Sequence, residues 1–178
     1  MADSTAPAEV ADPGVRRVNE LPDDRFRAEL AQCLDIGRWV EALLSARPFA
    51  DRAALVAAAD AHARTITDDE ADAALARHPR IGERAPGKDA EAAWSRSEQS
   101  GFADGEAAVR EAFAAGQAAY ERRFGRIYLV CASGLSGTEL LDGLRARMGN
   151  DPAEEARVVA DELRKIALLR IGKVLGTP

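Results

Sequence analysis

Apolar residues recur along most of the chain at intervals of three and four positions, which is the period of an amphipathic α-helix. Strong helix formers dominate, β-branched residues are sparse, and no hairpin dipeptide separates two alternating runs, so strands are not expected. The pattern predicts helices at 23–34, 39–44, 55–59, 67–77, 89–102, 104–124, from 136 onward, and from 151 to 174 or 175. The expected fold is therefore all-α, a compact single-domain bundle of about eight helices.

Three of the predicted helices begin with a capping-box pattern, in which an oxygen-bearing side chain stands three residues before a glutamate. The pairs are Thr67 with Glu70, Ser136 with Glu139, and Asp151 with Glu154. The ring of Pro79 disfavours helical geometry at His78, so the fourth helix should stop near Arg77. The apolar run from Ile127 to Ala132 is too short to assign by its period, and a buried extended connector is the expected form.

The length and charge of the chain limit the number of domains and the kinds of partner that can be expected. At 178 residues, 47% of them hydrophobic, the chain can bury one substantial core. Residues 1–14 are small and acidic and lack the regions of a signal peptide, which predicts a disordered tail before a helical domain at 15–178. The formal net charge of −6 includes no basic block, so binding to nucleic acid or an anionic membrane has no electrostatic support. A small molecule or a second copy of the chain is the expected partner.

The two cysteines and the hydropathy of the chain indicate the cellular compartment. Cys33 and Cys131 lie far apart and form no CxxC motif, which argues against a disulfide framework and a zinc ribbon. No run of about 18 apolar residues is present that could span a bilayer. We therefore expect a cytoplasmic protein.

One predicted helix carries three polar residues at a spacing that places them on a single face. Ser95, Glu98 and Gln99 stand at i, i+3 and i+4, and Phe102 extends the face at i+7. A hydroxyl, a carboxylate and an amide in fixed relation can hold a ligand rich in carbonyl and N–H groups. A solvated polar face is the alternative, and it is the commoner case for such a triplet.

Two further side chains are candidates for chemistry. His78 titrates near neutral pH and has a backbone constrained by Pro79, although an ordinary helix cap is the alternative. Arg170 interrupts the apolar stripe of the last helix, so its guanidinium either pairs with an inward acceptor or reaches out to solvent. His62 lies in an alanine-rich helical stretch and is expected to be structural. Two histidines sixteen residues apart, without clustered carboxylates or thiols, predict no metal site.

Two short motifs follow one another in the middle of the chain, HPRIG at 78–82 and WSRSEQSG at 94–101. Around them stand Asn19-Glu20-Leu21, Arg47-Pro48-Phe49, Phe124-Gly125, residues 128–132 and Leu169-Arg170. In this order the segments resemble the OHCU decarboxylases, a family named after 2-oxo-4-hydroxy-4-carboxy-5-ureidoimidazoline. The resemblance covers nearly the whole chain beyond the tail. Departures from the family pattern are modest. Tyr128 stands at a position where an aromatic or aliphatic residue is usual. The stretch 83–93 contains no motif that would anchor this loop.

The resemblance implies a fold, a reaction and a set of site residues. It implies an all-α enzyme without metal or organic cofactor that converts OHCU to (S)-allantoin and carbon dioxide, after urate oxidation and hydroxyisourate hydrolysis. His78 would be the proton donor, and Glu98 would orient its imidazole and favour the charged form. The substrate would be bound by Pro79, Ser95, Arg96, Ser97, Glu98 and Gln99, by Tyr128, Leu129, Val130, Cys131 and Ala132, and by Arg170 as a polar clamp.

Two other interpretations stay open on the sequence alone. The same acid-base and amide-binding groups would also suit hydrolysis or isomerisation of another ureide ring. A helical interaction module with a polar face for a partner protein is the non-catalytic alternative, and the inward position of Arg170 argues against it. A homodimer is compatible with the resemblance, because family members can be dimers.

Overall fold

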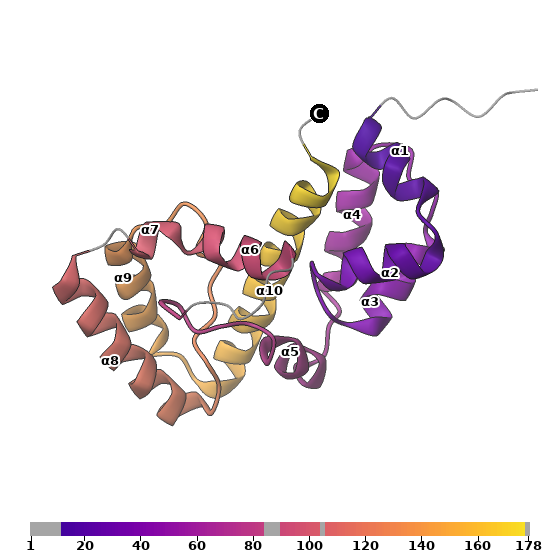
Figure 1. Cartoon of the computed structure of the whole chain (residues 1–178). Coiled ribbons are helices and arrows are strands. Elements are labelled where there is room, and N and C mark those ends of the chain that lie inside the picture. Colours follow the sequence, from indigo (N-terminus) through magenta and orange to yellow (C-terminus); the bar gives the residue numbers. More distant parts are fainter. Residues whose placement is uncertain (1–11, 84–89, 104–105, 177–178) are drawn as a thin grey trace, which may run out of the picture.

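The computed structural model describes residues 12–83, 90–103 and 106–176 (Figure 1). Within these ranges it contains ten helices and no strand, so the predicted all-α fold is confirmed. The helices are α1 (Pro13–Glu20), α2 (Asp23–Ala31), α3 (Gly37–Ser45), α4 (Arg52–Ala63), α5 (Asp68–Leu75), α6 (Ala90–Glu98), α7 (Ser100–Ala103), α8 (Ala107–Phe124), α9 (Gly137–Arg147) and α10 (Pro152–Leu175). Of the helices described, none combines the length and hydropathy needed to cross a bilayer.

The first of the two helices beyond the expected eight is α1, which starts at Pro13, inside the segment predicted as a disordered tail. The Asp12 carboxylate accepts the N–H groups of Gly14 and Val15 at 2.8 and 3.1 Å, as an N-cap does. The side chain of Val15 is fully buried, so the helix is anchored by packing as well. Residues 1–11 of the predicted tail lie outside the described residues.

The second additional helix arises because the helix predicted over 89–102 divides at Gln99 into α6 and α7. The N–H of Phe102 bonds to the carbonyl of Gln99, only three residues back, at 3.1 Å. Gly101 then lies against the loop before α9, where an added Cβ would come within 2.3 Å of the Leu135 carbonyl oxygen. Only glycine allows α7 to approach this loop so closely.

The N-caps predicted at Thr67, Ser136 and Asp151 are confirmed, the first two as complete capping boxes. At Thr67 and Ser136 the hydroxyl accepts the N–H three residues on, and the glutamate there accepts the N–H of the cap residue. Asp151 caps α10 by accepting the N–H three residues on at 2.7 Å. The expected helix starts at residues 89 and 104 lie outside the described residues.

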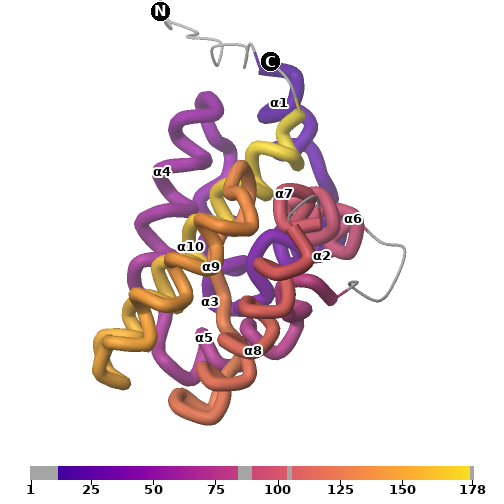
Figure 2. Tube along the Cα trace, turned by 90° about the vertical axis from the view of Figure 1, so that its left-hand side faces the viewer, coloured from indigo at the N-terminus to yellow at the C-terminus, as the bar shows by residue number. Residues whose placement is uncertain are grey.

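The long helix α10 runs through the middle of the molecule, with α1 to α4 on one side and α8 and α9 on the other (Figure 1); Figure 2 shows the same arrangement from the side. Apolar side chains gather in two cores. The first lies between α1 to α5 and α10 and includes Phe26, Trp39, Leu55, Val159 and Ile171. The second lies between α8, α9 and the connector and includes Phe113, Tyr120, Tyr128, Leu140 and Leu144.

Two irregular segments lie where these cores meet, and they carry several of the predicted site residues. The segment after α5 holds His78 and contributes Ile81 to the second core. The connector over 127–132 has neither helix nor strand, as predicted, and contributes Leu129 to the first core and Tyr128 to the second. The site residues are therefore positioned by the packing of both cores.

Candidate active site

His78 follows the last turn of α5 and is held there through both its backbone and its ring. Its N–H bonds to the carbonyl of Leu75 at 3.0 Å, and its Nδ1 lies 3.2 Å from the carbonyl oxygen of Ala74. Because a carbonyl can only accept, the proton of the neutral ring belongs on Nδ1. Nε2 is buried without a hydrogen-bond partner among the described residues. It is therefore a free acceptor inside the protein.

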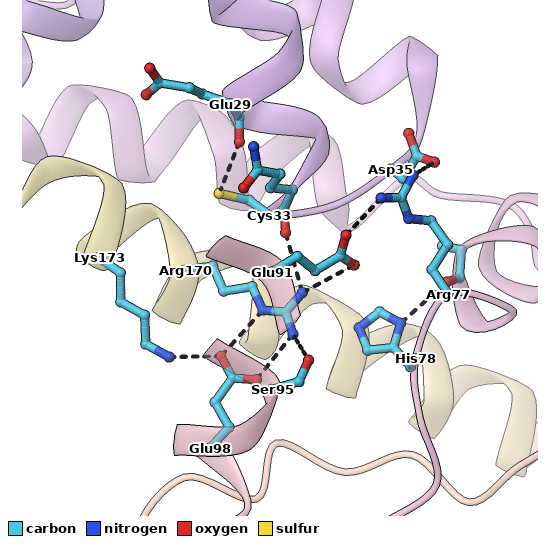
Figure 3. Close-up of polar contacts among 12 residues, drawn as sticks. Glu29, Cys33, Asp35, Arg77, His78, Glu91, Ser95, Glu98, Arg170 and Lys173 are labelled. Atoms are coloured by element: carbon cyan, nitrogen blue, oxygen red, sulfur yellow. Dashed lines mark hydrogen bonds and ion pairs between the residues drawn. The ribbon is translucent and has the colours of Figure 1, made fainter. Parts of the chain in front are cut away.

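The pKa of His78 is lowered to about 4, because burial and then the positive charge of Arg170 disfavour the imidazolium. The imidazole is consequently neutral near pH 7 in the free protein. Figure 3 shows it beside the guanidinium of Arg170. The charged histidine expected from the sequence is thus disfavoured by its surroundings.

Arg170 lies almost fully buried at 1% exposure, which confirms that it points inward from the apolar stripe of α10. Its Nε and Nη2 donate to the two carboxylate oxygens of Glu98 at 3.2 and 3.1 Å. Nη2 also donates to Ser95 Oγ at 3.0 Å, and Nη1 to the carbonyl of Gln32 at 3.2 Å. The fork of the guanidinium is matched to one carboxylate of α6.

Glu98 is the carboxylate that pairs with the cations of α10 in this site. Besides Arg170, it accepts a hydrogen bond from Lys173 Nζ at 2.8 Å. Burial alone would raise the pKa of Glu98, but the bonds and charges of Arg170 and Lys173 outweigh burial and lower it. Glu98 is therefore ionised, and both of its oxygens bind cations of α10. The expected contact in which Glu98 orients His78 is replaced by these two ion pairs.

The ion pairs continue from Arg170 toward the surface (Figure 3). Glu91 Oε1 lies 3.6 Å from Arg170 Nη1, and Glu91 Oε2 accepts from Arg77 Nη2 at 2.6 Å. Arg77 also binds Asp35 at 2.6 Å. Sequence reasoning missed Arg77, Glu91 and Lys173. One signal could have found two of them, because Glu91 stands two helical turns before Glu98 and Lys173 one turn after Arg170.

A small cavity of about 20 Å³ brings most of the predicted site residues together. Its lining includes His78, Pro79, Ser95, Glu98, Gln99, Tyr128, Leu129, Val130, Ala132 and Arg170, and it adds Ile81 and Ile166. A volume of this size holds about one water molecule. This cavity is therefore too small for a ureide, which can bind only if side chains or segments around it move.

Gln99 shapes the turn that carries the first motif. Its Oε1 accepts the N–H of Gly82 at 3.0 Å. Gly82 has a φ of +89°, in the left-handed region that side chains rarely adopt. The side-chain amide of Gln99, in the motif at 94–101, thus fixes the conformation of Gly82, in the motif at 78–82.

Three predicted binding residues lie outside the lining of this cavity. Arg96 and Ser97 are exposed, since their positions on α6 turn them away from the face of Ser95 and Glu98. Cys131 donates its N–H to Glu162 Oε2 at 2.7 Å, on the α10 side of the connector. Their roles in binding stay predictions. The described residues contain no cluster of three or more His, Cys, Asp or Glu side chains that could hold a metal ion.

The arrangement supplies a set of groups suited to a small anionic or ureide-like ligand. A neutral imidazole offers Nε2, a buried guanidinium offers positive charge, and Gln99 and Ser95 offer polar contacts beside them. Among buried groups such charges and dipoles act more strongly than in water. The site is equipped for proton transfer next to stabilised negative charge.

Comparison with known proteins gives a consistent result. A family model described as OHCU decarboxylase matches residues 19–172. A relative from Amia calva, named 2-oxo-4-hydroxy-4-carboxy-5-ureidoimidazoline decarboxylase, is 28% identical over 170 residues, which are 92% of this chain and 95% of the relative. A relative from Arabidopsis thaliana, named uric acid degradation bifunctional protein TTL, is 28% identical over 159 residues, 87% of this chain. The match spans about half, 48%, of that longer protein.

Solved structures show the same fold. A crystal structure of OHCU decarboxylase in the presence of (S)-allantoin superposes with a TM-score of 0.68 at 26% identity, covering 87% of this chain and 99% of the other. A crystal structure of (S)-allantoin synthase gives a TM-score of 0.65 at 18% identity over 88% of this chain and 52% of the other, which supports the fold alone. The family model accounts for most of the chain, and the two predicted motifs lie inside the matched region. The chain belongs to the OHCU decarboxylase family.

Proposed function

We propose that this protein decarboxylates OHCU and releases (S)-allantoin and carbon dioxide. The observation that carries the proposal is the small cavity of a family member, where His78 from the segment after α5, Glu98 from α6 and Arg170 from α10 lie together. The Amia calva relative, whose name states this activity, is covered over nearly its whole length. The substrate is then a small ureide that carries one carboxylate.

The proposed roles follow from the charges of the site. The bond between the ring carbon and the carboxylate breaks, carbon dioxide leaves, and the electron pair remains in the ring until a ring carbon is protonated. Overall, the anionic substrate takes up one proton to give a neutral product. Arg170 would stabilise the negative charge, because a buried cation close to the reacting atoms attracts the charge as it moves from the carboxylate into the ring.

His78 is the proposed proton donor, and it must first gain a proton itself. Its imidazole is neutral before binding, because its pKa is lowered to about 4. A substrate carboxylate beside the ring would favour the imidazolium and offset the effect of Arg170. His78 would therefore gain its proton as the substrate binds, and Nε2, which lacks a protein partner, would deliver it to one face of the ring.

The first experiment would generate OHCU in situ from urate with the two upstream activities and follow optically active allantoin by circular dichroism. We expect the protein to accelerate appearance of the (S) signal, and His78→Ala to lose this acceleration while keeping its helical spectrum. His62→Ala removes the other histidine, which lies on α4 away from the cavity, and should keep full activity. No acceleration by the wild type would contradict the proposal and redirect attention to hydrolysis or isomerisation of another ureide.

Two expectations about the protein in its cell also stay proposals. A cytoplasmic location is supported by Cys33 and Cys131, which are both free thiols. A homodimer rests on the family resemblance, and sedimentation velocity at micromolar concentration would show whether one forms.

A further inference from the structure

Arg170 is already fully engaged before any ligand arrives. Each of its three nitrogens has a partner, namely Glu98 at Nε, Gln32 and Glu91 at Nη1, and Ser95 and Glu98 at Nη2. Its bidentate partner Glu98 occupies the position that a ligand carboxylate would need. If Arg170 is to bind such a ligand, its contact with Glu98 must loosen.

Loosening that contact would be costly if Glu98 had no other cation. Glu98 is 8% exposed, and a buried carboxylate that loses its only partner destabilises a site strongly. Lys173 removes this difficulty, because its Nζ lies 2.8 Å from Glu98 Oε1 from the outset. Lys173 stands three residues after Arg170 on α10, and its side chain is 27% exposed, so it approaches Glu98 from the solvent side (Figure 3).

The position of Lys173 is fixed by a second contact. Its Nζ lies 5.9 Å from the ring centroid of Trp94, within range of a cation–π interaction. Trp94 is on α6, one turn before Glu98. The ammonium is thus aligned by the same helix that carries the carboxylate.

The charges of the site are balanced only when this lysine is counted. The connected ion pairs contain Asp35, Glu91 and Glu98 as anions, and Arg77, Arg170 and Lys173 as cations. A bound carboxylate adds one negative charge. Without Lys173 that carboxylate and Glu98 would compete for Arg170 alone.

We infer that Lys173 is a positioning residue: it holds Glu98 while Arg170 turns from Glu98 to the carboxylate of the substrate. The inference rests on the proposed function, because it requires a substrate that carries a carboxylate. Arg170 would exchange the carboxylate of Glu98 for that of the substrate, and Lys173 would keep Glu98 neutralised during this exchange.

The test compares Lys173→Met with the wild type on OHCU generated in situ. We expect KM to rise about tenfold with a smaller change in kcat, because the loss falls on binding of the anion. Lys173→Arg keeps the charge and should restore most of the lost affinity. The product (S)-allantoin has no carboxylate, so calorimetry should give equal affinities for the wild type and Lys173→Met. A loss of affinity for both ligands would indicate a distorted site and overturn the inference.

A double substitution separates this role from simple packing. Lys173 acts here through the charge of Glu98, so in a Glu98→Gln background the change Lys173→Met should leave KM within about twofold. An undiminished tenfold effect in that background would contradict the inference. Lys165→Met is the matched control, since Lys165 is on the same helix and pairs with Asp161 and Glu162 rather than with Glu98.

The two levels of the proposal can fail separately. A wild type that does not accelerate the reaction contradicts the proposed function. An active wild type whose KM is unchanged by Lys173→Met contradicts the role of Lys173 alone.

Discussion

At the scale of single residues, His78 is held in a charge state that the fold determines. Burial and the charge of Arg170 lower the pKa of its imidazole to about 4, from a reference value of about 6.5. Nδ1–H donates a hydrogen bond to the carbonyl of Ala74, and Nε2 is buried without a partner among the described residues. A buried Nε2 without a hydrogen-bond partner is a cost to the folded state that a bound ligand can remove.

This lowered pKa predicts how stability depends on pH. Between pH 6.5 and 4 the unfolded chain binds a proton on His78 that the folded chain does not. The contribution of the neutral His78 to the free energy of unfolding is therefore complete above pH 6.5 and is lost as the pH falls toward 4. Wild-type protein should therefore lose about 2 to 3 kcal/mol more stability than His78→Gln between pH 7.5 and 4.5. Urea unfolding of both proteins at the two pH values measures the difference. Equal losses would show that His78 is not held neutral.

Glu98 supports a second prediction at this scale. The amide of Glu98→Gln keeps one acceptor for Arg170 but removes the negative charge, so the turnover of OHCU should fall less than in His78→Ala. Steady-state kinetics of both variants on freshly generated OHCU test this order. A Glu98→Gln protein as inactive as His78→Ala would show that the charge itself takes part in the chemistry.

At the scale of elements, the connector over 127–132 depends on side chains from the two helices behind it. Arg147 Nη1 donates to the Leu129 carbonyl at 2.6 Å, and its guanidinium lies 4.6 Å from the centroid of the Tyr128 ring. Glu162 accepts the N–H of Cys131 at 2.7 Å. An irregular segment must find partners for its buried backbone groups, and α9 and α10 supply them here. The part of the cavity wall formed by the connector is thereby fixed.

The pair of Arg147 and Glu155 carries the prediction at this scale. Glu155 is fully buried and binds Arg147 Nε and Nη2 at 2.8 and 2.6 Å, as well as the hydroxyl of Tyr120. Arg147→Met would leave this carboxylate without its cation, which should cost about 3 to 5 kcal/mol in the free energy of unfolding. Arg145→Met, also on α9, removes an exposed arginine 3.7 Å from Asp142 and should change stability by less than about 1 kcal/mol. Similar losses in the two variants, measured by urea unfolding, would contradict the assigned role.

The helix starts and the face of α6 could be predicted from the sequence because they depend on residues within one or two turns. The cap at Ser136 is such a case, and so is the common face of Ser95, Glu98 and Gln99. The same spacing, applied strictly, would also have placed Arg96 and Ser97 on another face. The interrupted apolar stripe singles out Arg170 but leaves an inward and a solvent-directed guanidinium both open, and the structure shows the inward one.

Contacts between distant segments were beyond such reasoning. Arg147 reaches back 18 residues to Leu129, and Arg77 reaches forward 14 to Glu91. The division of α6 from α7 was missed for a related reason, since Gly101 is required by the nearby Leu135 carbonyl and not by its own helix. The neutral state of His78 likewise follows from burial among elements that the chain brings together only on folding.

At the scale of the whole molecule, α10 connects the two cores and the site between them. Near its start, Glu155 binds Tyr120 of the second core, and further along Val159, Ile166 and Ile171 belong to the first. The site residues Arg170 and Lys173 lie on the same helix. A separation of the two cores would therefore break α10 contacts and the cavity together.

The aromatic residues allow this coupling to be measured, because both tryptophans belong to the first core or pack against it, and both tyrosines belong to the second. Since one continuous helix is shared, we expect tryptophan fluorescence and tyrosine near-ultraviolet signals to give the same urea midpoint, as in two-state unfolding. Leu55→Ala in the first core and Leu144→Ala in the second remove side chains that are each 1% exposed, at a cost of about 2 to 5 kcal/mol. Each substitution should shift both signals equally. A shift confined to the probe of the altered core would show that the two halves unfold separately and that α10 does not couple them.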